Sequence, residues 1–234
     1  MSVQDDRDRL VVLLAASPSL AGVSRSGIKD LVGQGTLRRY RRGTYLCHQG
    51  DDASDVFFLL SGRVEVSGDS VTGTRVYHAT VDTPQFLGEL GPLGDMPRTA
   101  SIIAIVDSEV WVGEAEAFVK LVTTEPEAAR GLMRALARQV QAQQAFSEDL
   151  LFLDLKGRVA KRLLQLVTPD LDDLPGDGAI VPEVTQADLA SLCGGSRENV
   201  TRILKEFDRR GLVRREGHRY VLIKISALAK LAEL

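Results

Sequence analysis

One short stretch rich in small, apolar and turn-forming residues, FLGELGPLGDMPRTAS at 86–101, carries a carboxylate at Glu89 and its only guanidinium at Arg98. A guanidinium can bind an anion through paired N–H donors, and a carboxylate can accept a hydrogen bond from a hydroxyl. The stretch therefore predicts either a pocket for an anionic, hydroxyl-bearing molecule or a surface turn whose charges face water. The stretch alone leaves both interpretations open.

A second informative segment is TQADLASLCGGSRENVTRILKEF at 185–207. Thr185, with Asp188 three residues later, has the pattern of a capping box, and Ser196 can cap a second helix after a Cys-Gly-Gly turn. The i, i+3, i+4, i+7 spacing predicts a buried face on that second helix. Its members are Val200, Ile203, Leu204 and Phe207. Together these features predict a helix-turn-helix.

The exposed start of the second helix carries residue types that read bases, because Arg can bond guanine bidentately and Glu can accept from cytosine. The residues predicted to contact DNA are Ser196, Arg197, Glu198, Asn199, Thr201 and Arg202 of the second helix and its cap, with Thr185 at the start of the first helix. Downstream, GLVRRE and RYVLI flank Gly217–His218 and predict a β-hairpin wing, whose Arg214, Arg215 and Arg219 suit phosphate contacts. The alternative is that these are ordinary surface charges of a helix and a hairpin.

The first half of the chain must position the 86–101 stretch, and its pattern is that of strands. Between about Thr36 and Glu114, short β-rich runs alternate with Gly and Asp turns every 8–12 residues, which predicts an antiparallel sandwich or barrel. Gly43, Gly50, Gly62 and Gly73 fall at run boundaries, where positive φ is cheapest for glycine. Two short helices are expected before the strands, over Leu10–Ala16 and Ile28–Val32.

A long helix is expected between the two halves. Thr124 is predicted to cap it, with Glu125, Pro126 and Glu127 in its first turn. Its 4-3 apolar spacing predicts a coiled-coil seam formed by Ala129, Met133, Leu136, Val140, Gln143, Ser147 and Leu150. A homodimer is the simplest partner for such a seam, and packing on its own domain is the alternative. FLDLKGR at 152–158 predicts a hinge at which Asp154 caps the next helix.

Composition narrows the class of protein. With 234 residues, 44% hydrophobic and 26% charged, the chain is in the range of ordinary globular proteins. No apolar run approaches a membrane span, and the N-terminal LVVLLAAS follows acidic residues, so we expect a helix there and a cytoplasmic protein. Cys47 and Cys193 are isolated, and three histidines spell out no zinc site. No catalytic triad or phosphate-cradling loop is present, so an enzyme is not expected.

The net charge of −3 hides an asymmetry. From Leu155 onward there are 14 Lys and Arg against 11 Asp and Glu, a net charge of +3, so residues 1–154 carry −6. This predicts a polyanion partner for the C-terminal part, with a solvated charged face as the alternative.

These features together resemble the cyclic-AMP receptor protein / fumarate-nitrate regulator superfamily of bacterial transcription factors. The resemblance extends over about residues 10–225. The motifs that carry it, in order, are HQG (48–50), LLSGRVEV (59–66), LGELG (87–91), PRTA (97–100), FLDLKGRVA (152–160) and GSRENVTRILKEF (195–207).

The resemblance implies an α+β fold: an N-terminal antiparallel β-roll of the cyclic-nucleotide-binding type (1–123), a dimerisation helix with hinge (124–153) and a winged helix-turn-helix (154–234). It also implies a ligand, cyclic AMP or another cyclic nucleotide. Glu89 would accept from the ribose 2′-OH, Arg98 would pair with the cyclic phosphate, and Thr99 with backbone N–H groups after Gly88, including Leu90, would complete the site.

Two departures from the family pattern bear on the ligand. Pro84–Gln85 replaces the usual Gly-Asp before the 86–101 stretch, and Gln143–Gln144 stands where the best-known cyclic-AMP sensors place Thr-Ser against the purine. Glutamine can bond adenine, so these two residues either contact a purine or set the register of the seam.

The resemblance implies a homodimeric transcriptional regulator that binds a palindromic operator and acts with RNA polymerase. No metal, haem or iron–sulfur cluster is expected, because two isolated cysteines cannot supply four cluster ligands and no haem-attachment motif is present. Two alternatives stay open. The same regulator could act without a cyclic nucleotide or with another ligand, or the chain could be the cyclic-nucleotide module of a non-transcriptional effector.

Overall fold

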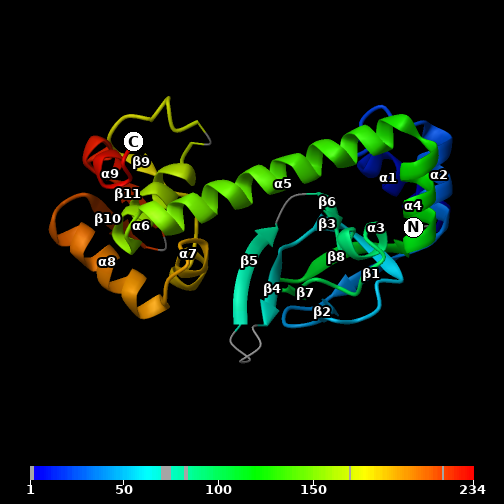
Figure 1. Cartoon of the computed structure of the whole chain (residues 1–234), viewed down its shortest axis with the longest axis horizontal. Coiled ribbons are helices and arrows are strands. Elements are labelled where there is room, and N and C mark those ends of the chain that lie inside the picture. The colour runs from blue at the N-terminus through cyan, green and yellow to red at the C-terminus, as the bar shows by residue number, and fades with distance from the viewer. Residues whose placement is uncertain (1–2, 70–74, 82–83, 169, 218) are drawn as a thin grey trace. The chain divides into compact units, whose positions relative to one another are not determined.

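The structure is a computed structural model of the chain that describes residues 3–69, 75–81, 84–168, 170–217 and 219–234 (Figure 1). The chain divides into two compact units, Met1–Val140 and Gln141–Leu234. Together they have the predicted α+β organisation: a β-sandwich, a long helix and a helix-turn-helix with a small wing sheet.

The first unit contains two four-stranded antiparallel sheets. One sheet has the order β1 (Gly35–Tyr40), β8 (Ser108–Glu114), β3 (Asp55–Ser61), β6 (Gln85–Leu87). The other has the order β2 (Tyr45–Cys47), β7 (Ser101–Ala104), β4 (Val64–Asp69), β5 (Arg75–Val81). The predicted sandwich is thereby confirmed, although β1 and β6 were not expected from the sequence.

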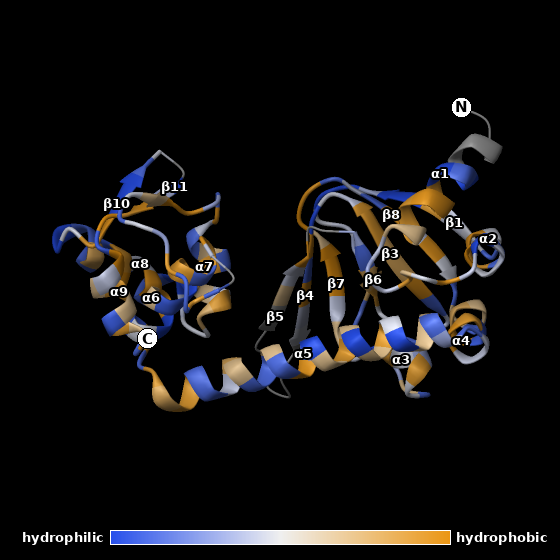
Figure 2. Cartoon of the chain, turned by 90° about the horizontal axis from the view of Figure 1, so that it is seen from above, coloured by the Kyte–Doolittle hydropathy of each residue, from blue (hydrophilic) through white to orange (hydrophobic). Residues whose placement is uncertain are grey.

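Strand β3 is buried on both faces, which explains its unbroken apolar run. Val56 and Phe58 belong to the cluster shared with the N-terminal helices, whereas Phe57 and Leu59 belong to the cluster between the sheets. Side chains alternate between the two faces of a strand, so one strand connects both cores. Figure 2 shows this concentration of hydrophobic residues along β3.

Helices cover the outer face of the β1-containing sheet. They are α1 (Val3–Ala15), α2 (Arg25–Gly33) and α4 (Ala115–Thr124), with the short α3 (Leu90–Leu93) inside the 86–101 stretch. The long helix α5 runs over Pro126–Phe152. The two expected N-terminal helices are confirmed, and α3 and α4 were not predicted.

The predicted cap at Thr124 is wrong. Thr124 ends α4, and its hydroxyl donates back to the carbonyl of Lys120 at 2.7 Å. Glu125 has an extended backbone, φ −108° and ψ 107°. A residue that precedes proline is disfavoured in the helical region, so α4 stops at this point and α5 begins at Pro126.

The second unit contains α6 (Leu155–Gln165), α7 (Gln186–Leu192), α8 (Arg197–Arg209) and α9 (Ile225–Leu231). Its three-stranded antiparallel sheet has the order β10 (Val213–Glu216), β11 (Arg219–Leu222), β9 (Ala179–Ile180). The helix-turn-helix and the hairpin wing are confirmed, while α9 and β9 were not predicted.

The local signals that define these helices are found as expected. Asp154 accepts from the Gly157 N–H and caps α6, and Ser196 accepts from the Asn199 N–H and caps α8. Thr185 and Asp188 form the complete capping box of α7. All four residues predicted for the inner face of α8 are buried.

Three of the four glycines expected at run boundaries have positive φ: Gly43 (85°), Gly50 (88°) and Gly62 (103°). Gly73 and His218 lie outside the described residues, and the side chain of His78 is not described. Within the part of the chain that the structure describes, no helix is long and apolar enough to span a membrane. The same residues contain no cluster of three or more His, Cys, Asp or Glu able to hold a metal ion.

Candidate anion pocket and nucleic-acid interface

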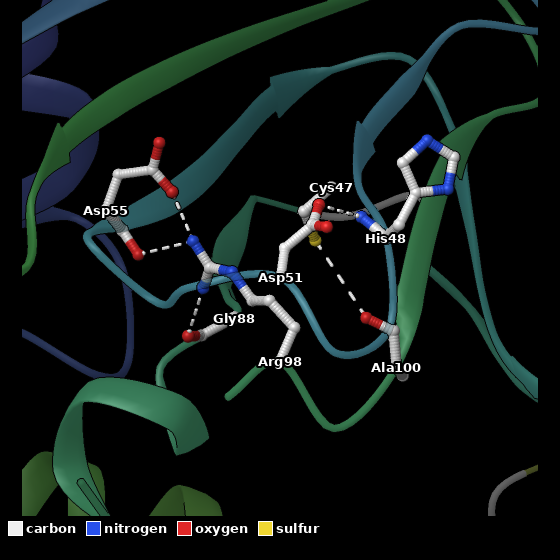
Figure 3. A network of polar contacts seen from close by, with 7 residues as sticks. All are labelled: Cys47, His48, Asp51, Asp55, Gly88, Arg98 and Ala100. Carbon is white, nitrogen blue, oxygen red and sulfur yellow. Dashed lines mark hydrogen bonds and ion pairs between the residues drawn. The ribbon is translucent and has the colours of Figure 1, made fainter. Parts of the chain in front are cut away.

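Arg98 lies inside the first unit, where its side chain is held on several sides (Figure 3). The residue is only 4% exposed. Its Nη1 donates to the Gly88 carbonyl at 2.7 Å, and its Nη2 donates to the Asp55 carbonyl at 2.7 Å and to the Asp55 carboxylate. The guanidinium also lies 4.9 Å from the centre of the Phe57 ring. A buried cation is thus paired with a carboxylate, which offsets its loss of hydration.

The backbone around Arg98 is fixed by the loop after β2. The Arg98 N–H donates to the Asp51 carbonyl at 2.8 Å, and the Gly50 N–H donates to the Arg98 carbonyl at 2.9 Å. The charged side chain therefore projects from an anchored segment. Among the residues that the structure describes, the buried Nε of Arg98 has no hydrogen-bond partner.

Gly88 has to be glycine for two reasons. Its φ is +74°, and a Cβ at this position would lie 2.6 Å from Arg98 Nη1 and 3.1 Å from the Phe57 ring. Only a residue without a side chain allows the 88 carbonyl to approach the guanidinium so closely.

Glu89 immediately precedes α3, and its carbonyl accepts from the Leu93 N–H. Burial raises the pKa of the Glu89 carboxyl above its ordinary value, while its own backbone N–H and the charge of Arg98 act in the opposite direction. A half-buried carboxylate of this kind favours a hydrogen-bond donor that would stabilise its charged form. The structure thus places Glu89 within the electrostatic reach of Arg98.

The remaining residues predicted for the ligand site have different surroundings. Leu90 begins α3 and is half-buried, whereas Thr99 is exposed beside Arg98. Gln143 and Gln144 are exposed on the part of α5 that belongs to the second unit. Their predicted contact with a purine stays a prediction.

Three large apolar residues of the predicted α5 seam, which also contains the polar Gln143 and Ser147, are exposed in the single chain. Met133 is 59% exposed, Val140 53% and Leu150 44%. The opposite side of the same helix is occupied, since Ala128 and Gly131 are buried and a Cβ at Gly131 would lie 2.1 Å from the Ser19 carbonyl oxygen. The first part of α5 thus packs on the first unit through a different face from the one that carries the seam.

In the second unit a surface pocket of about 310 Å³ lies beside the start of α8. Thr185 from the start of α7, Arg197 from α8 and Arg215 from the wing all line it. Three residues predicted from separate motifs to contact DNA thus meet at one place. Two guanidinium groups at its rim suit a phosphate.

A chain of hydrogen bonds connects the elements around this pocket. The Thr201 hydroxyl of α8 donates to Gln186 Oε1 at 2.9 Å, and Gln186 Nε2 donates to the Tyr220 hydroxyl at 3.2 Å. Tyr220 is a buried residue of β11. The predicted DNA contact of Thr201 stays a prediction, since its hydroxyl donates to Gln186 but can still accept a hydrogen bond.

Other predicted DNA residues also have protein partners. Arg202 Nη2 donates to Asn199 Oδ1 at 3.0 Å on the exposed face of α8. Arg214 lies 2.7 Å from the Glu216 carboxylate, whereas Arg215 bonds only the Gly217 carbonyl among the described residues. Arg197 and Glu198 are exposed at the start of α8, next to the cap residue Ser196. In the wing, Arg214 thus forms an ion pair with Glu216, whereas no carboxylate among the described residues pairs with Arg215.

The predicted hinge at 152–158 is bridged by ion pairs and hydrogen bonds. Lys161 of α6 pairs with Asp149 near the end of α5 at 2.6 Å. Arg158 donates to the carbonyls of Leu153 and Cys193, each at 2.8 Å. The end of α5 is thereby attached to α6 and to the turn of the helix-turn-helix. Cys193 is packed in that turn, and burial raises the pKa of its thiol to about 12.

Sequence reasoning missed three residues of these sites: Asp55, Gln186 and Tyr220. Asp55 is 43 residues from Arg98, and Gln186 is 34 residues from Tyr220. No local pattern joins such pairs. One signal in the sequence was that Asp55 stands at the start of an apolar run, which indicates a charged residue at the end of a buried strand.

Comparison with known proteins agrees with this geometry. The cyclic nucleotide-binding domain family matches residues 37–125, and the Crp-like helix-turn-helix domain family matches residues 157–234. The chain is 29% identical over 220 residues to the CRP-like cAMP-activated global transcriptional regulator of Mycobacterium tuberculosis, covering 94% of this chain and 98% of that protein. It is also 29% identical over 188 residues to the cAMP-activated global transcriptional regulator CRP of Salmonella typhimurium, covering 80% and 89%.

Solved structures share the architecture. The Thermus thermophilus catabolite activator protein is 26% identical with a TM-score of 0.51, covering 93% of this chain and 99% of that one. The c-di-GMP-responsive global regulator CLP of Xanthomonas campestris has a TM-score of 0.70 at 23% identity, covering 86% and 99%. CooA of Carboxydothermus hydrogenoformans has a TM-score of 0.73 at 19% identity, covering 95% of each chain. The last two likenesses concern the fold alone.

Proposed function

Because the chain belongs to the CRP/FNR family of DNA-binding transcriptional regulators, which are not enzymes, we propose that it is a homodimer controlled by a cyclic nucleotide bound in the first unit. The proposed functional segments are residues 1–123 for the ligand, 124–153 for dimerisation and hinge, and 154–234 for DNA. RNA polymerase is the proposed partner at promoters, and the cytoplasm is the proposed location.

The observation that carries the ligand proposal is the buried guanidinium of Arg98, whose Nε has no partner. A buried donor without an acceptor is costly, and an anion at this position would satisfy it. Glu89, with a carboxyl whose burial disfavours its charge, is suited to accept from a hydroxyl of the same molecule. A cyclic phosphate with a neighbouring ribose 2′-OH offers both groups.

The remaining roles follow from the same arrangement. Arg98 would hold the phosphate, Thr99 and the backbone N–H groups of Gly88 and Leu90 would complete the anion site, and Glu89 would hold the ribose. Gln143 and Gln144 would contact the purine. Cyclic AMP is the first candidate, since the curated relatives at 29% identity are cAMP-activated regulators.

The proposed DNA interface consists of the start of α8 and the wing. Arg197, Glu198 and Arg202 would read bases, and Arg215 with Thr185 would bind backbone phosphates at the pocket. The exposed seam of α5 supports the homodimer, because large apolar side chains on a helix favour association. Two recognition helices related by a dimer axis predict a palindromic operator with half-sites about 34 Å apart.

The test is calorimetry of the full chain with cyclic AMP, cyclic GMP and c-di-GMP, followed by a DNA mobility shift with and without the ligand that binds. We expect one of the two cyclic mononucleotides to bind the wild type and Arg98→Ala to abolish that binding. If only c-di-GMP binds, or none of the three, the cyclic mononucleotide assignment is wrong. Random-sequence selection that recovers no palindrome would contradict the dimeric DNA reader.

A further inference from the structure

The hydrogen bonds of Arg98 show that its anion-binding groups are already occupied. A guanidinium has five N–H donors, two on each Nη and one on Nε. Nη2 donates twice, to the carbonyl and to the carboxylate of Asp55. Nη1 donates to the Gly88 carbonyl, and within the described part of the chain the Nε hydrogen and one Nη1 hydrogen have no acceptor (Figure 3).

These leftover donors cannot grip a phosphate as a pair. A guanidinium binds two oxygens of one anion through either of two forks, Nε with Nη2 or Nη1 with Nη2. Nη2 belongs to both forks, and Asp55 takes both of its hydrogens. The leftover hydrogens lie on different edges of the group. No bidentate fork is free while the Asp55 carboxylate stays in place.

The geometry also indicates which partner gives way. The Arg98 side chain is 3% exposed, lies on the Phe57 ring and projects from a backbone held by two hydrogen bonds to the 50–51 loop. The Asp55 side chain is 37% exposed and sits on the first residue of β3. A carboxylate at the edge of a strand can turn into water, whereas the guanidinium has no comparable route.

We propose that Asp55 is an affinity- and specificity-determining residue of the Arg98 site: its carboxylate occupies the place of an anionic ligand and has to be displaced from Nη2. Inorganic phosphate that displaces the Asp55 carboxylate replaces only its charged contact with Arg98. A ligand that also bonds Glu89 through a hydroxyl has a second contact to offset the displacement. Because the displacement weakens every anion that binds Arg98, only a ligand that also bonds Glu89 keeps enough affinity to occupy the site at low concentration. The inference rests on the proposed cyclic-nucleotide function for the identity of that ligand.

The experiment titrates cyclic AMP and cyclic GMP into the full chain by calorimetry and follows thermal unfolding with inorganic phosphate. The variants are Asp55→Ala, which removes the competing carboxylate, and Asp55→Asn, which keeps an oxygen acceptor without the charge. Asp52→Ala is the matched control, since it removes an exposed carboxylate three residues away that does not contact Arg98. Asp55→Ala combined with Arg98→Ala shows whether any gain depends on the guanidinium.

We expect Asp55→Ala to bind the cyclic nucleotide roughly 5- to 50-fold more tightly than the wild type, in the range of one partly exposed charged hydrogen bond. Asp55→Asn should lie between them, and Asp52→Ala should match the wild type. Inorganic phosphate should raise the melting temperature of Asp55→Ala, but not that of the wild type or of the double variant.

Two results would overturn the inference while leaving the cyclic-nucleotide function intact: a wild type that binds with Asp55→Ala unchanged, or Asp55→Ala binding more weakly because the carboxylate positions Arg98 for the ligand. A third result would separate the two proposals: phosphate stabilises Asp55→Ala but not the double variant, and no variant binds a nucleotide. The competition between Asp55 and an anion would then be supported, and the cyclic nucleotide would be excluded as the ligand. Absence of both nucleotide binding and the phosphate effect would refute both proposals.

Discussion

The Thr201 hydroxyl on the recognition helix α8 donates a 2.9 Å hydrogen bond to Gln186 on the preceding helix, and Gln186 in turn reaches the buried Tyr220 of the wing. The start of α8, the start of α7 and the wing are thereby connected through three side chains. If α8 and the wing form the proposed DNA interface, these hydrogen bonds set the position of α8 relative to the wing.

A double-mutant cycle tests this connection. Thr201→Val and Gln186→Ala should each weaken operator binding by about 0.5–1.5 kcal/mol, the usual contribution of one hydrogen bond, and the double variant should cost less than the sum. Binding titrations on the operator measure the coupling. Thr123→Val is the control, because that hydroxyl bonds only carbonyls of its own helix. Fully additive losses would show that the bond plays no part in DNA recognition.

Arg214 and Arg215 of the wing should differ in their effect on DNA binding. Arg214 is paired with the Glu216 carboxylate, whereas Arg215 lines the pocket. We expect Arg215→Ala to weaken all sequences alike and to reduce the slope of log K against log salt by about 0.9. Arg214→Ala should reduce it by less. The measurement is affinity at several salt concentrations on specific and random DNA, and equal slopes for the two variants would contradict the assignment.

The apolar seam of α5 predicts which substitutions separate the protomers. Val140→Glu places a charge on a residue that is 53% exposed in the single chain and that a dimer would bury. Monomers that no longer bind the palindrome are the expected result, measured by sedimentation. Gln141→Glu, the next residue but off the seam, adds the same charge and should remain dimeric. A wild type that sediments as a monomer at micromolar concentration would rule the seam out as an interface.

Glu89 predicts how binding and stability change with pH. Burial raises the pKa of its carboxyl above the ordinary 4.5, so the folded protein holds this proton to higher pH than the unfolded chain. The group therefore contributes stability below pH 4.5 that is lost as pH rises through the raised pKa. A ligand hydroxyl favours the charged form, so affinity should rise with pH over the same window. Glu89→Gln should flatten both curves in denaturation and calorimetry, and an unchanged pH profile would exclude Glu89 from the site.

Gly88→Ala should damage the anion site through the backbone. The new Cβ would meet Arg98 Nη1 at 2.6 Å in a residue with φ of +74°, so we expect a loss of stability of about 1–3 kcal/mol and loss of ligand binding. Gly43→Ala is the comparison, because it also has positive φ but open space around its Cβ. If both variants keep wild-type affinity for the ligand, the close approach of residue 88 to Arg98 has no role in binding.

The helix starts and the buried face of α8 could be predicted from the sequence, because they depend on neighbouring residues. The caps at Asp154, Thr185 and Ser196 bond an N–H three residues ahead, and the buried face of α8 follows from its spacing alone. The predicted helix cap at Thr124 was wrong because two local rules compete there. Pro126 suits the first turn of α5, but a proline also ends the helix that precedes it.

The contacts that set the chemistry of both sites were decided only by the tertiary structure. Asp55 meets Arg98 because β3 and the 86–101 stretch lie together in the sandwich, and Gln186 meets Tyr220 because the wing folds back onto α7. Such pairs depend on strand order and packing, which no spacing along the chain records. The sequence by itself determined which residue types carry charge and where helices begin, whereas the packed fold decided that the guanidinium suited to a phosphate already holds a carboxylate.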